Sequence, residues 1–139
     1  MSGRTSCQRP YPDRPGVPLN ELSIIDRFFR PLAGEGAFRL TDDAARVSVP
    51  AGCDLVVTTD MIAAGVHFLP GDPADSIAQK AVRVNVSDLA GKGAKPFGYV
   101  LSLGLGEDAD EAWLAGFSEG LRRDQDFYAM VSPPSSAIA

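Results

Sequence analysis

The chain has 139 residues, of which 45% are hydrophobic and 22% are charged, values ordinary for one globular domain with its own core. Its net charge of −5 and its pI of about 4.7 argue against a nucleic-acid-binding protein, because such proteins usually carry a basic surface. There is neither an apolar run near the roughly 20 residues of a membrane span nor an apolar leader segment, so we expect a cytoplasmic protein without a membrane partner.

The N-terminal part is predicted to contain one helix. Residues 1–18 are rich in proline, glycine and polar residues, and we expect a disordered tail there. A helix is predicted over residues 21–30, with Asn20 as its N-cap and Pro31 at its end. Residues 34–39 then form a predicted loop that contains glycine.

Three segments carry patterns typical of β-strands. Residues 45–49 alternate between apolar and polar side chains, as in a half-exposed strand. Residues 54–59 hold a short apolar run that suits a strand buried on both faces. Residues 97–105 place large side chains on one face and small ones on the other, which makes this segment the clearest predicted strand.

A long helix is predicted between the second and third of these strands. Asp72 is placed as an N-cap, with Pro73 at the first helical position. The helix is expected to run to about Ala90, and Gly91 and Gly93 to end it.

The last predicted element is an amphipathic helix over residues 108–123. Asp108 and Glu111 resemble a capping box in which aspartate replaces the usual serine or threonine. The apolar face is expected to enter the core through Trp113, Phe117 and Leu121. Residues 131–139 fit neither a helix nor a strand and are expected to form an irregular tail.

Carboxylates stand at predicted element boundaries in three places, which are Asp42 with Asp43, then Asp60, then Asp88. Mg²⁺ takes oxygen ligands, usually one or two carboxylates together with waters and substrate phosphates, so carboxylates that converge from separate segments could hold it. The pattern alone leaves another interpretation open. Asp42 then belongs to a turn, Asp60 ends a strand, and Asp88 is a solvated helix residue.

His67 is the chain's only histidine and lies in the sequence Gly-Val-His-Phe. Such a residue is either a ligand contact or a packed or surface side chain. No phosphate-binding glycine loop is present, so a nucleotide would have to be held through metal ions. Cys7 and Cys53 lie far apart and are expected to be free thiols in a reducing compartment. A Ser/His or Cys/His hydrolase would need residues to converge in space.

Several ordered blocks resemble the thiamine-monophosphate kinases, which belong to a superfamily that includes aminoimidazole ribonucleotide synthetase. The blocks are Leu40–Ala45, Thr58–Met61, Gly65–Leu69, Lys80–Ala81 with Val84–Ala90, and Gly93–Pro96. The resemblance covers the N-terminal domain of that family. It implies an α/β (α+β) fold, a mixed β-sheet with helices packed on one side, and a metal- and ATP-binding domain at residues 19–130.

The resemblance also implies roles for individual residues. The implied magnesium ligands are Asp42, Thr58, Thr59, Asp60 and Asp88, with Asp43 and Asn85 as secondary candidates. His67 is implied to contact thiamine monophosphate. The implied reaction moves the γ-phosphoryl group of ATP onto thiamine monophosphate and forms thiamine diphosphate, with Mg²⁺ as cofactor and a homodimer as the assembly. No protein nucleophile is needed, so no catalytic residue is assigned.

The chain departs from the family pattern at several positions. Thr41 stands where the family usually has glycine, Lys92 where methionine is common, and no tyrosine lies in register near Ser118. Family members also continue into a Gly-Gly-Asp-Thr block and a second domain, whereas this sequence ends at Ala139. We therefore expect a truncated chain. The alternative to a kinase is a non-catalytic fragment that acts at most as a metal-binding or dimerising module.

Overall fold

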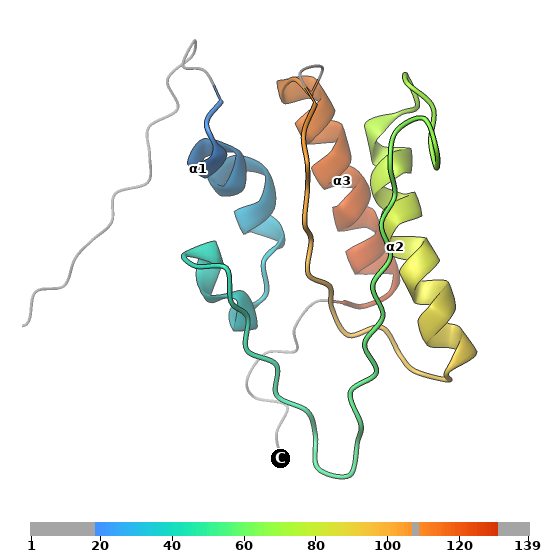
Figure 1. Cartoon of the computed structure of the whole chain (residues 1–139). Helices are drawn as coiled ribbons and strands as arrows, with labels where there is room; N and C mark the ends of the chain where they lie inside the picture. Colours follow the sequence, from blue (N-terminus) through green and yellow to red (C-terminus); the bar gives the residue numbers. More distant parts are fainter. Residues whose placement is uncertain (1–18, 107–108, 131–139) are drawn as a thin grey trace, which may run out of the picture.

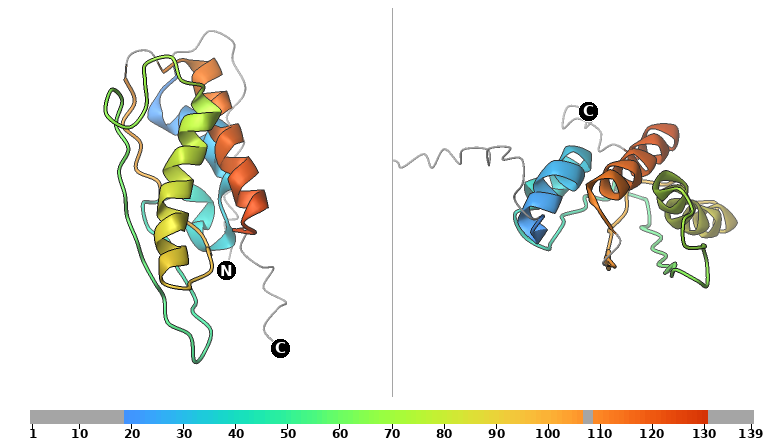
Figure 2. Two further views of the ribbon diagram at one scale, coloured as in Figure 1. Left: turned by 90° about the vertical axis from the view of Figure 1, so that its right-hand side faces the viewer. Right: turned by 90° about the horizontal axis from the view of Figure 1, so that it is seen from above.

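The computed structural model describes residues 19–106 and 109–130, so the two predicted tails lie outside the described residues. The described elements, in chain order, are α1 (Glu21–Ile24), η1 (Ile25–Phe29), η2 (Arg30–Leu32), η3 (Glu35–Leu40), α2 (Ala74–Gly91) and α3 (Glu111–Phe127). Figure 1 shows α3 between α1 and α2, and the view from above in Figure 2 shows the same order. No helix in the described ranges combines the length and apolar character needed to cross a bilayer.

The N-terminal helix begins where the sequence predicts. Asn20 caps α1 through its side-chain oxygen, which accepts from the Ser23 backbone N–H at 2.9 Å, while the Ser23 hydroxyl accepts from the Asn20 N–H at 3.0 Å. This reciprocal pair satisfies two backbone donors that a helix start leaves unpaired. The helix then widens into the π turn η1 and tightens into the 3₁₀ turn η2, which contains Pro31. The predicted loop at residues 34–39 is largely the 3₁₀ element η3.

Both ends of α2 are set by local hydrogen bonds. Asp72 does not cap the helix as predicted, because its carboxylate accepts from the Leu69 N–H at 2.8 Å and closes the preceding turn. At the other end Gly93 adopts φ +69°, and the Ala94 N–H bonds to the Leu89 carbonyl at 3.0 Å. This left-handed glycine ends the helix as a Schellman motif.

Helix α3 is shifted along the chain from its predicted range of 108–123. Its N-cap is Asp110, whose carboxylate accepts from the Trp113 N–H at 2.8 Å, and the predicted cap Asp108 lies outside the described residues. The helix continues past Arg123 to Phe127 because Asp124 still faces α2 and is buried there.

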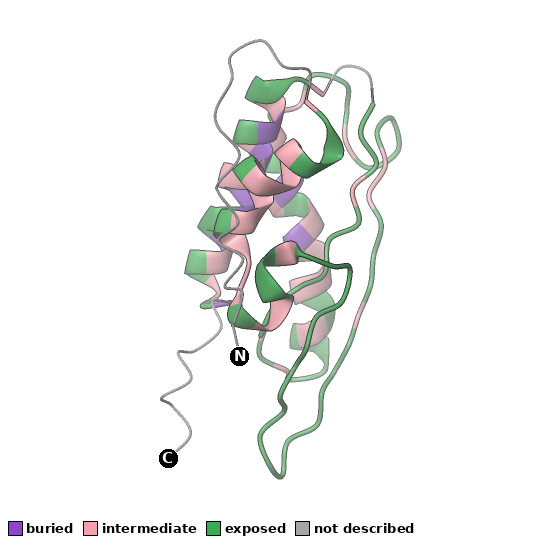
Figure 3. Cartoon of the chain, turned by 90° about the vertical axis from the view of Figure 1, so that its left-hand side faces the viewer, coloured by how far each residue is buried: buried purple, intermediate pink, exposed green. Residues whose placement is uncertain are grey.

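The core lies between α2 and α3. Phe117 and Leu121 are 2% and 1% exposed, which confirms their predicted place in the core, whereas Trp113 is only partly buried. Its ring stacks on Phe117 with centroids 5.0 Å apart. Figure 3 shows the buried residues concentrated on these helices. The other buried members of this cluster are Ile77, Ala78, Val82 and Met130.

Two glycines on α3 allow the helices to approach closely. A Cβ atom at Gly120 would lie 2.4 Å from the Asp75 carbonyl oxygen and 2.9 Å from the Ala78 Cβ. A Cβ at Gly116 would lie 3.3 Å from the Ala74 Cβ, which is a milder contact. The backbone of α2 therefore occupies the space that a side chain at position 120 would need.

The predicted mixed β-sheet is wrong for the part of the chain that the structure describes. Its residues form no strand, and the single bridge pairs Ala64 with Phe68 across a turn. Residues 45–49, 54–59 and 97–105 are drawn as extended segments without a ladder (Figure 1).

The physical reason is that alternation specifies an extended backbone but cannot supply a pairing partner. A strand becomes stable only beside another strand at hydrogen-bonding distance. Here the apolar side chains stay largely in solvent, with Val57 77% and Val100 88% exposed. Of these extended segments, residues 97–105 contact the core through the partly buried Leu103. Ile62 and Phe68, which lie between residues 54–59 and α2, also pack against the core.

We predict that Gly120→Ala lowers the free energy of unfolding by about 1 to 3 kcal/mol, because the new methyl group overpacks the contact with α2. Alanine favours a helix interior over glycine by about 1 kcal/mol, and we expect the overpacking to exceed this gain. Urea unfolding followed by circular dichroism measures the change. Gly91→Ala is the control, since no atom lies within 4 Å of its Cβ position. Equal midpoints for Gly120→Ala and the wild-type chain would contradict the close approach.

Candidate functional site

An open groove of about 620 Å³ lies along the outer face of α2. Asp60, from the extended segment before α2, contributes one side of it. The rest of the lining comes from α2 and consists of Ser76, Gln79, Lys80, Arg83, Val84, Ser87 and Asp88. The groove is therefore a helix face closed on one side by an extended segment.

A polar stripe on α2 makes up much of this groove. Ser76, Lys80, Arg83 and Ser87 recur at spacings of four, three and four, which places them on one helix face. The sequence analysis did not single out this stripe as functional, although its periodicity was visible. Two hydroxyls and two cations along one face are suited to bind the oxygens of an anion.

The structure brings together some of the predicted metal ligands. Asp60 and Asp88 line the same groove, and the Thr58 hydroxyl donates to the Asp88 Oδ2 at 3.3 Å. Thr58 and Asp88 also line a second groove of about 450 Å³, so Asp88 borders both. The Asp60 Oδ1 accepts from the Met61 N–H at 3.0 Å, which orients its carboxylate.

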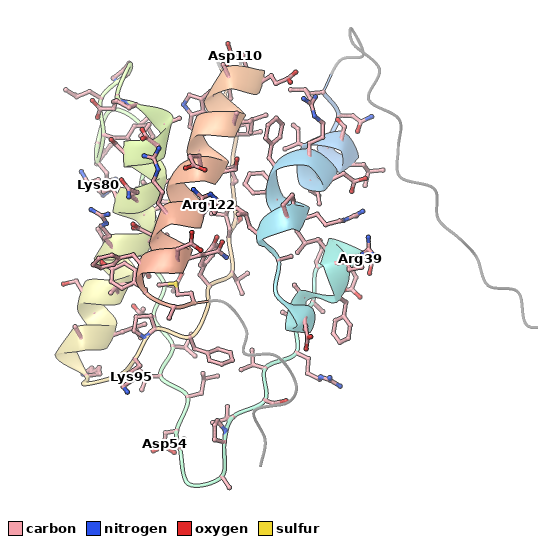
Figure 4. All side chains as sticks on the ribbon, turned by 180° about the vertical axis from the view of Figure 1, so that it is seen from behind. Arg39, Asp54, Lys80, Lys95, Asp110 and Arg122 are labelled. Carbon is pink, nitrogen blue, oxygen red and sulfur yellow. The ribbon has the colours of Figure 1, made fainter. Side chains whose placement is uncertain are left out.

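Other predicted ligands are not brought to this place. The Asp42 Oδ1 accepts from the Ala44 N–H at 2.9 Å in a turn after η3, and η3 lies on the far side of α3 from α2 (Figure 1). In Figure 4, Arg39 of η3 and Lys80 of α2 lie on opposite sides of α3. Thr59 and Asp43 are exposed, and neither they nor Asp42 are among the residues that line the two grooves.

Asn85, a secondary candidate, is engaged elsewhere. Its side-chain amide donates to the Ala81 carbonyl oxygen at 3.0 Å, one turn back on its own helix. The side chain is partly buried, so this bond satisfies a group that would otherwise lose its contact with water. The structure thus gives Asn85 a role in α2 itself.

The donors near Asp88 fit a magnesium ion. Thr58, Asp60 and Asp88 offer only oxygen atoms, the donor type that Mg²⁺ prefers. Among residues 19–106 and 109–130 no group of three or more histidine, cysteine, aspartate or glutamate side chains is arranged to hold a metal. Mg²⁺ commonly keeps several waters and binds through one or two carboxylates, so two carboxylates and a hydroxyl suffice for such a partly hydrated ion.

An ion pair between the exposed Arg83 and a buried carboxylate holds one wall of the groove. Asp124 of α3 is 1% exposed, and both of its oxygens accept hydrogen bonds from Arg83, each at 2.9 Å. The Gln79 amide adds a third bond at 3.0 Å. The hydrogen bond from Asp124 raises the pKa of Arg83 above its usual value. The sequence analysis missed Asp124, although its spacing from Phe117 and Leu121 places it on their apolar face.

His67 lies in the loop that precedes α2, and its side chain is exposed. Its Nδ1 atom accepts from the Ala63 backbone N–H at 3.0 Å. The Lys80 ammonium, which lines the groove, donates to the His67 carbonyl oxygen. The only histidine is therefore attached to the groove wall through its backbone.

Residues 41–131 match the family described as AIR synthase related protein, N-terminal domain. The chain belongs to this family. The match begins just before Asp42 and includes the Asp60–Asp88 groove, so the AIR synthase related domain contains every predicted ligand. No solved structure matches the chain.

Several curated proteins that are similar to this AIR synthase related domain carry the name "Thiamine-monophosphate kinase". The protein from Caulobacter vibrioides is 44% identical over 110 residues, which cover 78% of this chain and 31% of that protein. The protein from Escherichia coli is 43% identical over 114 residues, which cover 79% and 34%. The protein from Aquifex aeolicus is 34% identical over 110 residues, which cover 79% and 35%. The chain thus spans about a third of the length of these relatives.

We predict that Arg83→Met costs about 3 kcal/mol of stability, because it leaves the Asp124 carboxylate buried with only the Gln79 amide as a partner. Arg123→Met is the matched control. Arg123 also joins α3 to α2, through Asp75 at 3.0 Å, but both of these side chains are accessible to water, so the loss is much smaller. Urea midpoints measure both variants. Equal losses would mean that burial of Asp124 does not decide the energetics.

Proposed function

We propose that this chain is the metal- and nucleotide-binding N-terminal part of a thiamine-monophosphate kinase. The proposed reaction transfers the γ-phosphoryl group of ATP onto thiamine monophosphate and forms thiamine diphosphate. Family membership and the shared name of the relatives support the reaction. The observation that carries the proposal is that Asp60 and Asp88 line one groove with Lys80, while the Thr58 hydroxyl bonds to Asp88.

The chemistry requires little from the protein beyond position and charge. Thr58, Asp60 and Asp88 would hold Mg²⁺, which supplies positive charge that offsets the repulsion between two phosphate groups. Lys80 adds positive charge along the same groove, whereas the charge of Arg83 is paired with Asp124. Since the acceptor is itself a phosphate oxygen, the protein needs no nucleophile.

The remaining predicted residues complete this proposal. We propose Thr59 and Asp42 as further magnesium ligands. For these residues to reach Asp88, the exposed stretch 41–60 has to move toward α2 when ions and nucleotide bind. Asp43 stays a secondary candidate, and His67 is the proposed contact to thiamine monophosphate. The exposed free thiol of Cys53 supports a reducing compartment, and we propose the cytoplasm.

A second candidate function is a non-catalytic metal-binding or dimerising module. Homodimer formation is supported by apolar side chains that stand in solvent, among them Val57, Met61 and Val100, which are 77%, 76% and 88% exposed. Sedimentation velocity tests homodimer formation, and a monomer at every concentration would exclude a dimerising module.

A coupled assay of the full chain with ATP, Mg²⁺ and thiamine monophosphate tests the kinase proposal. We expect thiamine diphosphate above background, and we expect Asp60→Asn to abolish it, because one of the two carboxylates at the proposed ion is lost. Product that survives in Asp60→Asn would contradict the site. If no product forms, retained magnesium binding in calorimetry would support the module instead.

The control for the metal site compares two carboxylates by calorimetry with Mg²⁺ and nucleotide. Asp88→Asn is expected to weaken magnesium binding by roughly tenfold or more, because Asp88 lies between Thr58 and Asp60 and loses its charge. Asp43→Asn removes the same charge at an exposed position outside the groove and is expected to weaken binding less. Equal and negligible losses would count against a shared site.

A further inference from the structure

The segment Ala63–Asp72, called the His67 loop below, closes on itself through backbone hydrogen bonds. The His67 N–H donates to the Ala63 carbonyl at 2.9 Å, and the Gly65 N–H donates to the Phe68 carbonyl at 2.8 Å. Gly65 adopts φ +75°, a left-handed conformation that a side chain would strain. Phe68 packs against the core cluster, so the loop is folded and anchored.

The hydrogen bond at the His67 ring assigns its tautomer. A backbone N–H can only donate, so the Nδ1 atom that faces the Ala63 N–H at 3.0 Å has to be the unprotonated acceptor. In a neutral imidazole the proton then resides on Nε2. Because the residue is exposed, this N–H is open to a hydrogen-bond acceptor from solution.

Lys80 connects this loop to the groove. Its ammonium donates to the His67 carbonyl oxygen, and its side chain lines the groove that Asp60 and Asp88 also line. Figure 4 labels Lys80 on α2. A lysine has three donors and no acceptor, so this bond to the backbone leaves two donors for other partners. The cation and the histidine are thus held together at one edge of the groove.

We propose that Lys80 is a positioning residue that fixes the His67 loop, so that His67 presents a neutral Nε2–H donor to a phosphate oxygen of the bound substrate. The identity of that substrate, thiamine monophosphate, rests on the function proposed above. The tautomer and its dependence on Lys80 rest only on the contacts within the loop. In this role Lys80 acts through His67 and the loop backbone, and this role is separate from the positive charge that its ammonium brings to the groove.

Nitrogen-15 spectroscopy of the full chain tests the tautomer without any ligand. The chain contains one histidine, so its imidazole signals belong to one residue. At about pH 8 we expect a protonated Nε2, an unprotonated Nδ1 and a through-hydrogen-bond coupling between Nδ1 and the Ala63 nitrogen. A protonated Nδ1 would overturn the proposal.

Substitutions at Lys80 test the positioning role. In Lys80→Met we expect the coupling to disappear and the two nitrogen signals to move toward the average of both tautomers. Lys80→Arg is expected to restore the coupling in part, because a guanidinium also donates to a carbonyl oxygen. Lys95→Met removes an exposed lysine that lines neither groove and is expected to leave the spectrum unchanged. An unchanged spectrum in Lys80→Met, with the helical circular dichroism retained, would overturn the proposal.

The same imidazole nitrogen-15 signals test the contact with the substrate. Thiamine monophosphate added with Mg²⁺ is expected to shift the Nε2–H resonance, and Lys80→Met is expected to raise the dissociation constant by about tenfold, the usual scale for one hydrogen bond to a charged group. If the tautomer is as assigned but thiamine monophosphate causes no shift, the proposed substrate fails and the loop geometry stands. If the shift occurs with a protonated Nδ1, the substrate stands and the inference on Lys80 fails.

Discussion

The close contact of α2 with α3 is the constraint on which the rest of the structure depends. Gly120 leaves the backbone around Asp75 in the place of a side chain, and this lets the apolar faces of both helices meet over Phe117 and Leu121. Because α2 is a rigid helix, fixing the face that packs on α3 also fixes the direction in which its opposite face points. The groove with Lys80 lies on that outer face, so the packing of the core decides where the site faces.

The ion pair inside this contact connects the core to the groove. Asp124 is buried, and water cannot replace the hydrogen bonds that Arg83 and Gln79 donate to it. Both donors also line the groove. A carboxylate in the core therefore fixes the position of side chains that face solvent, and the groove wall needs no support from the extended segments.

The helices and part of the core were predictable because their signals are local. Asn20 as a cap, Gly93 as a terminator and Phe117 in the core follow from spacing over a few residues. The sheet was not predictable from such patterns, since pairing depends on distant segments and here residues 97–105 have no partner among the described residues. The physical content of a strand pattern is an extended backbone, and that much is present.

For the candidate site, pattern and resemblance identified Asp60 and Asp88, which the structure places at one groove. They gave no role to Arg83, nor to Lys80, which stands in one of the resembling blocks, because long cations on a helix are usually solvated surface residues and only the fold reveals their neighbours. Asp42 was grouped with the others by resemblance, but it follows η3, which lies beyond α3. Convergence in space is the property that a sequence motif does not encode by itself.

The unpaired extended segments divide the chain into parts of unequal local stability. Amides within α2 and α3 are held by helical hydrogen bonds over a packed core and exchange with solvent only when the whole contact opens. Residues 54–60 have no ladder, so their amides exchange through small fluctuations. If the proposed ion binds between Asp60 and Asp88, it connects the two parts, and some of its binding free energy goes into ordering residues 54–60. Slower amide hydrogen exchange in residues 54–60 after a ligand is added therefore reports that the ligand has bound at the groove.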